Sequence, residues 1–518
     1  MCCSVKAITQ FHHGALRLIA EQFSLVCQSP VLLHLQGISF YRLDRFNEAI
    51  KAYEMALALQ PEFPAALNSL GFVLQDVGRM EDALKAFERA LQIAPEFSMA
   101  RLNLGLAQLK LGDWENGWEN YEARWTGSAE TASPDFRRPN VPLSQWDGQE
   151  GTEKQALLVV TEQGFGDTFQ FSRFLLEAKK KFARVGFACS QPTQRLLEWA
   201  MGNEIVLLIS LPTDYAVWDW YCPLMSLPRA LKVRVEDIPS PEPYFPVPFQ
   251  AKNYWANRLE ALAPGRMRVG IAWTGRKTHQ YDSRRSIRFE QISRLLQTPY
   301  VTWVSLQKWG AEEIGPSIPR SVDWVDLTPD LMDFADTAAL LSNLDLIISV
   351  DSSLIHLAGM MGTPAWMLNR FDSEWRWLGS RSDSPWYPNL RIFNQPKFGD
   401  WTSVLELVGE ELHQLPKPQV PAKTKQVQLS NPVEATTLPT SPLTEQQAME
   451  MASQLQSAGR PLEAEHVLRQ LISVNPSHGH ALHLLGVAVY QLGRHEEAIE
   501  YLRKAVEFVP NQALFQTN

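Results

Sequence analysis

The sequence predicts two α/β lobes with parallel sheets, carried between two all-α arrays of helical hairpins. Three observations lead to this fold class. Small residues and prolines recur every 34 positions near both ends of the chain. Between those ends, short apolar runs alternate with helical patterns, which is typical of βαβ units in a parallel sheet. A proline-rich stretch divides the alternating region into two sets of elements, so we expect two lobes.

The first 130 residues carry helical repeats, which we expect to be regular from about residue 30, after a degenerate leading hairpin over residues 1–29. Residues of one kind recur at a step of 34: Gly37, Gly71 and Gly105, and Pro61 and Pro95. A small residue lets the two helices of a hairpin touch, and proline ends the second helix because it cannot continue the helical hydrogen bonds. The pattern closely resembles the tetratricopeptide repeat (TPR) family, whose stacked hairpins form a concave groove that commonly binds peptides.

The same pattern returns over residues 446–518. Alanines and prolines again stand 34 residues apart: Ala464 and Ala498, and Pro476 and Pro510. Two such repeats are fewer than the roughly three that a stacked array needs. Two explanations stay open: these hairpins pack on another surface, or the array is shortened.

The region between the repeats begins with a lobe that we assign to residues 131–248. Its first strand is the apolar run at 156–161, and a helical pattern follows over 169–182. The segments RVGFACS, QPTQRLLEWA and EIVLLIS then predict a strand, a helix and a strand. Parallel sheets of this kind bind ligands at the carboxyl ends of their strands. Prolines concentrated over 239–248 end the lobe.

A second lobe over residues 249–415 repeats the alternation. Its strands are expected in RVGIAWTG, YVTWVSLQ, LDLIISV and PAWMLN, and its helices in FEQISRLLQ, in DTAALLSN and from Ser353 onward. Two lobes joined by prolines imply a cleft between them. Residues 416–445, rich in proline and polar side chains, are expected to be a disordered linker.

The composition argues against several classes of protein and of ligand site. With a net charge of −9 and an isoelectric point of about 5.8, no protein-wide nucleic-acid surface is expected. Five scattered cysteines without a C-x-x-C pair argue against a disulfide framework and against a zinc site. Without a signal-peptide pattern or a run of 18 apolar residues, we expect a cytoplasmic protein with no membrane span.

Three turns that follow predicted strands are candidates for chemistry. The first turn, EQGFGDT, contains Gln163, Gly164, Gly166 and Asp167. Its glycines let the backbone approach a ligand at a helix N-terminus. A dinucleotide fingerprint needs a third glycine where Phe169 stands, so a Rossmann dehydrogenase is disfavoured. From composition alone, Asp167 is more simply a helix N-cap, with Gln170 as its partner in a capping box.

The second turn, after RVGIAWTG, is basic. Asp282 is the only acid among five cations: Arg276, Lys277, Arg284, Arg285 and Arg288. Such a run is either a solvated face or a site for a phosphate, and the residues alone favour neither. The position of the run after a strand, in an otherwise acidic protein, supports the phosphate interpretation, because a diphosphate bound at a strand end would need positive charge.

The third turn, SVDSSLIH, follows the strand LDLIISV. Backbone N–H groups at Ser352 and Ser353, together with the helix dipole, would form an anion site. A simple capping role for Asp351 or Ser352 is the alternative. A lone histidine such as His356 is more often a packed side chain than a catalyst.

The three turns together resemble GT-B-fold glycosyltransferases of the heptosyltransferase type, glycosyltransferase family 9, over roughly residues 156–415. In that family a G-x-G-D turn opens the first helix of the acceptor lobe, and its aspartate is the catalytic base. Gly164, Gly166 and Asp167 match this turn. The resemblance therefore implies that Asp167 is the base and that Gln163 and the two glycines form the acceptor loop.

The donor lobe of that family carries a D-[ST]-x-x-x-H turn, and the chain matches it. The segments DSSLIHLAGMMGTPAW, EWRWL, DSPWYPNLRIF and WVSLQK are also similar to TPR-linked bacterial members. With the basic turn, the resemblance assigns donor binding to Thr274, Arg276, Lys277, Gln307, Lys308, Asp351, Ser352, Ser353 and His356. One departure is Arg276, where members of the family often have a small polar residue.

The resemblance implies an inverting transfer of a sugar from a nucleotide-sugar to an acceptor hydroxyl. Because the chain has no D-x-D motif, no metal is expected. The nucleotide-sugar is expected as a co-substrate, with no other cofactor. TPR repeats joined to a sugar transferase also resemble the arrangement of protein O-glycosyltransferases. The expected partners are therefore a nucleotide-sugar and a protein or peptide bound by the repeat groove.

Two alternatives stay open. In one, the acceptor is a glycan or a lipid-linked sugar, and the repeats only dock the enzyme. In the other, the chain is a catalytically inactive scaffold with a vestigial transferase fold. The intact Asp167 and Asp351, together with the basic turn, favour an enzyme.

Overall fold

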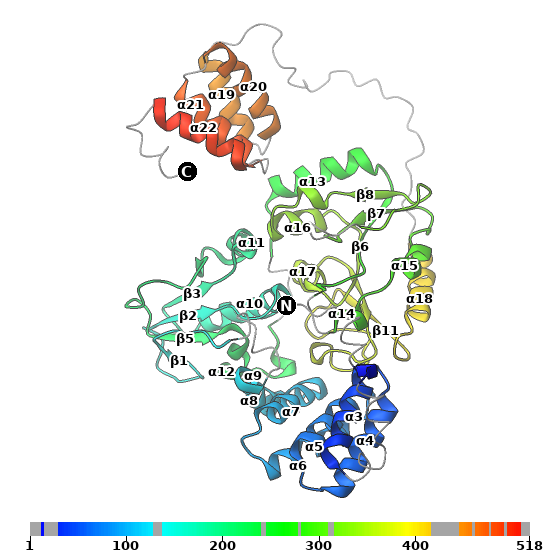
Figure 1. Ribbon diagram of the computed structural model, residues 1–518. Coiled ribbons are helices and arrows are strands. Elements are labelled where there is room, and N and C mark those ends of the chain that lie inside the picture. Colours follow the sequence, from blue (N-terminus) through cyan, green and yellow to red (C-terminus); the bar gives the residue numbers. More distant parts are fainter. Residues whose placement is uncertain are drawn as a thin grey trace. The chain divides into compact units, whose positions relative to one another are not determined.

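The computed structural model describes residues 12–14, 29–127, 137–239, 245–277, 281–308, 315–415, 445–457, 461–475, 478–491 and 495–508. These residues form two compact units, which we describe separately. The first unit holds the N-terminal helices and both sheets, and the second holds one helix of the middle region and the C-terminal helices. Figure 1 shows the elements coloured along the chain from blue to red.

The first unit begins with three helical hairpins, as the 34-residue step predicts. They pair α3 (Pro30–Arg42) with α4 (Phe46–Leu59), α5 (Pro64–Asp76) with α6 (Met80–Ile93), and α7 (Ser98–Leu111) with α8 (Trp114–Tyr121), and the short α9 (Arg124–Gly127) follows. The repeated glycines lie where helices meet, because a Cβ on Gly71 would come within 2.7 Å of the Phe87 ring. A Cβ on Gly37 would lie 2.3 Å from the Tyr53 ring. Apart from 12–14 and 29, the hairpin expected at 1–29 lies outside the described residues.

The first sheet has five parallel strands in the order β1-β5-β2-β3-β4. They are β1 (Ser144–Gln145), β2 (Ala156–Val160), β3 (Arg184–Ala188), β4 (Val206–Leu208) and β5 (Trp220–Pro223). The helices are α10 (Phe165–Lys179), α11 (Gln191–Met201) and the short η3 (Leu224–Ser226), α12 (Leu227–Ala230) and η4 (Val235–Asp237). β2, α10, β3, α11 and β4 confirm the predicted alternation. The sequence patterns miss β1 and β5, although β5 pairs with β2 and is therefore internal.

The second sheet has six parallel strands in the order β11-β10-β9-β6-β7-β8. They are β6 (Met267–Ala272), β7 (Val301–Ser305), β8 (Trp324–Asp326), β9 (Leu346–Val350), β10 (Ala365–Asn369) and β11 (Leu390–Asn394). The helices are α14 (Asp282–Arg285), α15 (Phe289–Leu295), η5 (Thr328–Asp330), α16 (Phe334–Leu341), α17 (Ser353–Met361), η6 (Trp375–Trp377) and α18 (Trp401–Gln414). The four strands expected here are all present, and β8 and β11 are additional.

Each sheet reverses its direction of winding at one point. In the first sheet the chain passes from β2 through β3 to β4, and β5 then pairs with the other side of β2. In the second sheet it passes from β6 through β7 to β8 and returns at β9, beside β6. Ligands of open parallel sheets bind outside the carboxyl ends of the strands at such a switch. The loops after β2, β6 and β9 therefore begin where a ligand is expected.

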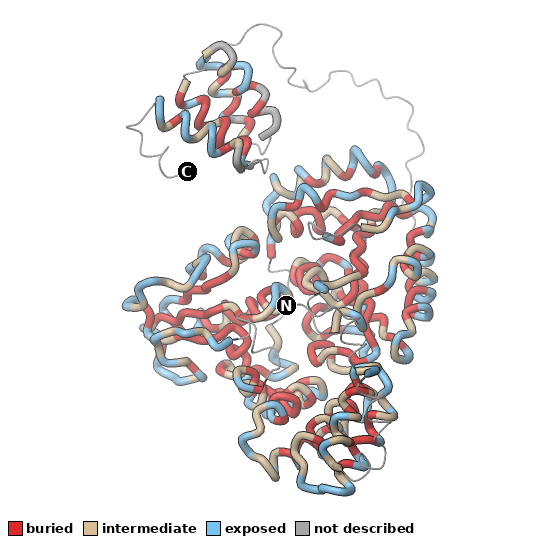
Figure 2. Tube along the Cα trace, viewed as in Figure 1, coloured by how far each residue is buried: buried red, intermediate tan, exposed pale blue. Residues whose placement is uncertain are grey.

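The sheets form the buried centre of the first unit. Every residue of β2, β7, β9 and β10 is buried, and Figure 2 shows β2 and β7, at their places in Figure 1, mainly in red. Strands covered on both faces are continuous apolar runs, which is why the sequence revealed them. Because the strands are buried and apolar, the polar side chains of a ligand site are expected in the loops at the strand ends.

The second unit contains α13 (Phe249–Leu262) and four C-terminal helices: α19 (Glu445–Ser457), α20 (Pro461–Val474), α21 (Gly479–Gln491) and α22 (His495–Phe508). The C-terminal helices form two hairpins with a shared apolar core, as predicted. A Cβ on Gly486 would lie 2.7 Å from Leu502, so this glycine has the same packing role as those of the N-terminal repeats. The linker expected over 416–445 lies outside the described residues except for Glu445, which begins α19.

Candidate active site

The loop after β2 leads directly into α10 and carries the predicted acceptor turn. Gly164 is the N-cap residue of α10, and Asp167 is the third residue of the helix. The Asp167 Oδ2 atom accepts the Gly164 N–H at 2.9 Å. The prediction that Asp167 is the N-cap and Gln170 its capping partner is therefore wrong, because the helix begins three residues earlier. Gln170 is fully buried, and its side chain has no hydrogen-bond partner among the described residues.

The other carboxylate oxygen of Asp167 binds the guanidinium of Arg376, in η6 of the second lobe. Arg376 also forms an ion pair with Glu374 at 2.6 Å, and its side chain is only 9% exposed. The predicted base therefore takes part in an ion pair between the two lobes. The sequence assigns no role to Arg376, and its only signal is an arginine placed between two tryptophans.

Burial dominates the ionisation of Asp167. Loss of hydration raises the pKa of its carboxyl above the usual value, while the charge of Arg376 and the Gly164 N–H act in the opposite direction. A raised pKa makes the ionised carboxylate a stronger base than an exposed aspartate. The positive charge of Arg376 favours the ionised form of Asp167, which is the form that can accept a proton.

His356 brings the third turn against the first. A Cβ on Gly166 would come within 2.8 Å of the His356 Cδ2 atom, so α10 and α17 approach closely at this glycine. The His356 Nδ1 atom lies 3.0 Å from the Tyr387 hydroxyl oxygen. The imidazole also stacks on Trp377, with 5.3 Å between ring centroids. Gly166 and His356, which the sequence identifies in separate motifs, are therefore neighbours.

The imidazole of His356 is neutral at physiological pH. Burial, with the nearby positive charge of Arg376 as the second cause, lowers the pKa of His356 to about 3. Glu374 acts in the opposite direction and Arg173 in the same direction as Arg376. The contact of its Nδ1 atom with the Tyr387 hydroxyl holds the imidazole in place.

The neutral His356 is expected to make the protein sensitive to acid. Between pH 6.5 and about 3 the unfolded chain binds a proton at His356 and the folded chain does not. Stability that is fully present above pH 6.5 is therefore lost as the pH falls, by at most about 1.4 kcal/mol per pH unit. Urea unfolding at pH 6.5 and pH 5.0 should show a loss about 1–2 kcal/mol larger in the wild type than in His356→Gln. Equal losses would mean that the folded protein protonates His356.

The turn after β9 starts α17 with a capped N-terminus. Ser352 is the N-cap residue, and its Oγ atom accepts the Leu354 N–H at 3.3 Å. The Asp351 Oδ2 atom accepts the Trp377 Nε1–H at 3.0 Å. Ser352 thus has the capping role that the sequence left open, and Ser353 begins the helix. The three residues lie together beside the switch point of the second sheet.

The turn after β6 is held by Gln307. Its Oε1 atom accepts the N–H groups of Trp273 at 3.2 Å and of Thr274 at 3.0 Å. Gln307 is buried, so in this structure it fixes the backbone of the predicted donor turn. Three cationic residues that the sequence assigns to donor binding are exposed to solvent: Arg276, Lys277 and Lys308.

The basic run between positions 276 and 288 does not form one surface. Arg284, with a side chain 9% exposed, forms ion pairs with three carboxylates: Asp44 at 3.0 Å, Asp76 at 2.9 Å and Asp372 at 2.8 Å. Its neighbour Arg285 donates instead to the Asp351 carbonyl oxygen at 3.2 Å. A run that looks uniform in sequence is therefore divided between the N-terminal repeats and the third turn.

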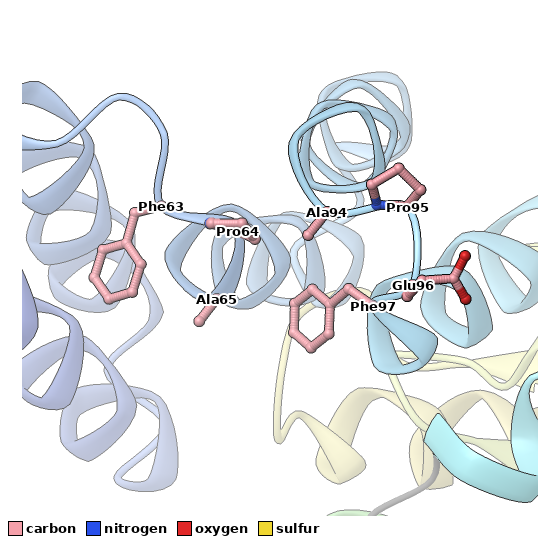
Figure 3. A pocket seen from close by; sticks show the side chains of 7 residues that line it. All are labelled: Phe63, Pro64, Ala65, Ala94, Pro95, Glu96 and Phe97. Atoms are coloured by element: carbon pink, nitrogen blue, oxygen red, sulfur yellow. The ribbon is translucent and has the colours of Figure 1, made fainter.

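The N-terminal repeats carry an apolar surface groove of about 530 Å³, shown in Figure 3. Two equivalent turns between repeats line it: Phe63, Pro64 and Ala65, and Ala94, Pro95, Glu96 and Phe97. Phe63 and Phe97 are 34 residues apart, so the repeat itself builds both walls. The groove lies at the starts of α5 and α7.

Two further features concern only the described ranges. There, no helix combines the length and the apolar character that a membrane crossing requires. In the same part of the chain, no three histidine, cysteine, aspartate or glutamate side chains are grouped to hold a metal ion.

Family models match separate parts of the chain. Residues 288–393 match the model of glycosyltransferase family 9 (heptosyltransferase). Residues 34–96, 73–123 and 449–513 match a tetratricopeptide repeat model. The chain thus carries tetratricopeptide repeats near both ends and a family 9 region between them, and the two flanked parallel sheets confirm the predicted fold class.

Similar proteins were found among curated sequences and solved structures. Protein FlbA of Caulobacter vibrioides is 28% identical over 320 residues, which cover 57% of this chain and 52% of that protein. The chain therefore spans about half the length of this curated relative. The E. coli ADP-heptose LPS heptosyltransferase II has 13% identity over 50% of this chain and 97% of its own, with a TM-score of 0.37. A family 9 glycosyl transferase from Veillonella parvula has 9% identity over 52% and 92%, with a TM-score of 0.35.

Proposed function

We propose that this chain is an inverting, metal-independent glycosyltransferase that moves a sugar from a nucleotide-sugar to an acceptor hydroxyl. One observation carries the proposal. The G-x-G-D and D-S-x-x-x-H turns lie at the switch points of two parallel sheets and contact each other at Gly166 and His356. A carboxylate base on one sheet and an anion-binding helix start on the other suit an acceptor and a nucleoside diphosphate.

In the proposed step, the Asp167 carboxylate takes the proton of the acceptor hydroxyl while the oxygen attacks the anomeric carbon. The new C–O bond forms on the face opposite the phosphate, and the bond between the anomeric carbon and the diphosphate oxygen breaks. The nucleoside diphosphate leaves with the electron pair of that bond. Attack from the opposite face inverts the anomeric configuration.

The charge of the departing diphosphate needs compensation. The N-terminus of α17 at Ser352 and Ser353 supplies backbone N–H groups and the positive end of the helix dipole. Lys277, in the exposed turn after β6, is the proposed cation. The absence of a D-x-D motif from the sequence is our reason to propose transfer without a metal.

Two further residues are proposed to orient the donor. Asp351 is fixed by the Trp377 indole N–H, and His356 by the Tyr387 hydroxyl. Because His356 is neutral, it offers one N–H or one lone pair to a ligand and carries no charge to attract or repel it. We propose that neither Asp351 nor His356 transfers a proton.

The proposed acceptor is a protein or peptide recruited by the N-terminal repeats. The groove between Phe63 and Phe97 is apolar and has a volume of about 530 Å³, which suits side chains of an extended peptide. A glycan or lipid-linked acceptor remains the alternative for the same chemistry. The cytoplasm, where nucleotide-sugars are available, is the proposed location.

Nucleoside diphosphates of one base are expected to raise the melting temperature of the full chain. Binding at 100 times Kd stabilises the folded state by about 2.7 kcal/mol. A thermal-shift screen with ADP, UDP, GDP and CDP would measure this and would identify the base. The shift should shrink in Asp351→Asn, which alters the donor turn, and persist in Asp167→Asn, which alters the acceptor loop.

No shift with any of the four nucleotides or their sugars at millimolar concentration would contradict the proposal. The chain would then be better described as a scaffold with a vestigial transferase fold, and the repeats would carry its function.

A further inference from the structure

The N-terminal repeats contact both halves of the candidate active site. The contacts come from α5, α8 and α9, and they reach the acceptor loop, α10, η6 and the turn over 281–286. Each involves buried polar or aromatic side chains.

The first contact is a buried ion pair at the start of the acceptor loop. Arg124, in α9, binds Glu162 with two hydrogen bonds, of 2.9 and 3.0 Å, and their side chains are 4% and 2% exposed. Glu162 also accepts the Met225 N–H at 2.9 Å, directly after β5. Arg124 itself donates to the Ser226 hydroxyl at 2.7 Å, so this residue, directly after the last hairpin, joins the loops that follow both strands at the switch point. A two-bond pair of this kind fixes direction as well as distance.

The second contact reaches the next residue of the loop. The Tyr121 hydroxyl oxygen, at the end of α8, accepts the Gln163 Nε2–H at 3.0 Å. Gln163 has φ of 60°, in the left-handed region that side chains other than glycine rarely adopt. Such a conformation persists only where the surroundings enforce it. The Tyr121 hydroxyl and the adjacent Arg124–Glu162 pair contact the loop at this residue and the one before it.

The third contact is aromatic and comes from Trp118. Trp118 of α8 packs edge-on against Phe171 of α10 and Trp375 of η6, at centroid distances of 6.0 and 5.4 Å. These two helices supply Asp167 and Arg376. The last helix of the repeats therefore spans both elements that form the pair between the lobes.

The fourth contact holds the donor side. Asp76 of α5 binds Arg284 and also accepts the Tyr41 hydroxyl at 2.7 Å. Arg284 belongs to α14, whose next residue, Arg285, donates to the Asp351 carbonyl oxygen.

The same turn also supports the strand end after β6. Ser286 donates to Asp282 at 2.9 Å and accepts the Gly275 N–H at 3.1 Å. The turn over 281–286 is therefore joined to the repeats on one side and to two donor turns on the other.

We propose that the N-terminal repeats position the two halves of the transferase site, with Tyr121 acting on the acceptor loop and Asp76 on the donor turns. This inference rests on the proposed function but goes beyond the recruitment of an acceptor. Both are positioning residues, since neither belongs to the turns assigned to the reacting groups. Because they act on different lobes, their effects on the reaction should separate.

Two single substitutions in the full chain test the separation. Tyr121→Phe keeps the ring and removes the hydroxyl that holds Gln163, so kcat should fall about tenfold with donor KM unchanged within about twofold. Asp76→Asn keeps the shape and removes a charge from Arg284, so donor KM should rise about tenfold with kcat within about twofold. Arg79→Gln, which breaks the exposed pair with Asp82 in the same repeats, should change neither.

Hydrogen exchange of the unliganded chain supplies a readout that does not depend on activity. Amides of 163–168 should exchange faster in Tyr121→Phe, and those of 281–288 in Asp76→Asn, with Arg79→Gln like the wild type. Unchanged exchange in both segments, or equal losses in kcat and KM for both variants, would overturn the inference. If the wild type binds none of ADP, UDP, GDP or CDP, the proposed function fails, while the exchange data still decide whether the repeats hold these loops.

Discussion

Replacing Asp167 by asparagine is expected to lower kcat for sugar transfer by about 10²–10⁴-fold, the usual contribution of a general base. The amide has nearly the shape of the carboxylate, and its oxygen can still accept the Gly164 N–H that Asp167 accepts at 2.9 Å. An amide takes up no proton at neutral pH, so the acceptor hydroxyl loses its base. The measurement is steady-state transfer with the nucleotide-sugar that the thermal-shift screen identifies.

The matched control lies on the same helix. Glu177, in α10, pairs with Lys180 at the protein surface, and its side chain is 33% exposed. Glu177→Gln removes one carboxylate from the same helix and should leave kcat within about twofold, as expected for a surface ion pair. If Asp167→Asn kept more than about a tenth of the wild-type kcat, Asp167 would not be the general base.

Most of the fold is predictable because its signals are local. Glycine recurs in the repeats where it touches an aromatic ring of the neighbouring helix, as Gly71 does with Phe87. The buried strands are continuous apolar runs, so β2 and β9 stand out in the sequence. Two of the missed strands are too short to show this signal: β1 has two residues and β8 three. Their pairing partners, not their own composition, make them strands.

The candidate site likewise has some features that the sequence predicts and others that it does not. Its turns follow strand ends and are visible as short motifs, and the structure brings Gly166 and His356 together. The partners of Arg376 and Arg284 are not visible, because Arg376 is 209 residues from Asp167 and Arg284 is 208 residues from Asp76. No local pattern separates Arg284 from Arg285, although one faces the repeats and the other the third turn. Such pairings depend on the packing of whole lobes and repeats.

These long-range pairs show that the N-terminal repeats are packed against the lobes and are not a separate module. In sequence they form a separate module, joined to the lobes only by the chain. In the structure Arg124 and Asp76 extend the buried polar network of the site into the repeats.

Replacing Arg376 by methionine is expected to move the acid limb of the pH–rate profile upward by about 1–3 pH units. Burial already raises the pKa of Asp167, and the positive charge of Arg376 is the main influence that lowers it. Without that charge the pKa of Asp167 rises further, so transfer should be lost at a higher pH than in the wild type and should return in more alkaline solution. Arg376→Lys keeps a positive charge beside Asp167, so its acid limb should stay near that of the wild type even if kcat falls.

The stability of Arg376→Met should follow the same ionisation. Removing one partner of a buried ion pair lowers the free energy of unfolding by about 3 kcal/mol. Because the pKa of Asp167 in the folded variant lies above that of the unfolded chain, the stability present at low pH is lost as the pH rises through the folded value. Urea unfolding should therefore show a smaller deficit against the wild type at pH 4.5 than at pH 7.5. A deficit independent of pH, together with an unshifted acid limb, would show that Arg376 holds the lobes together without controlling the charge of Asp167.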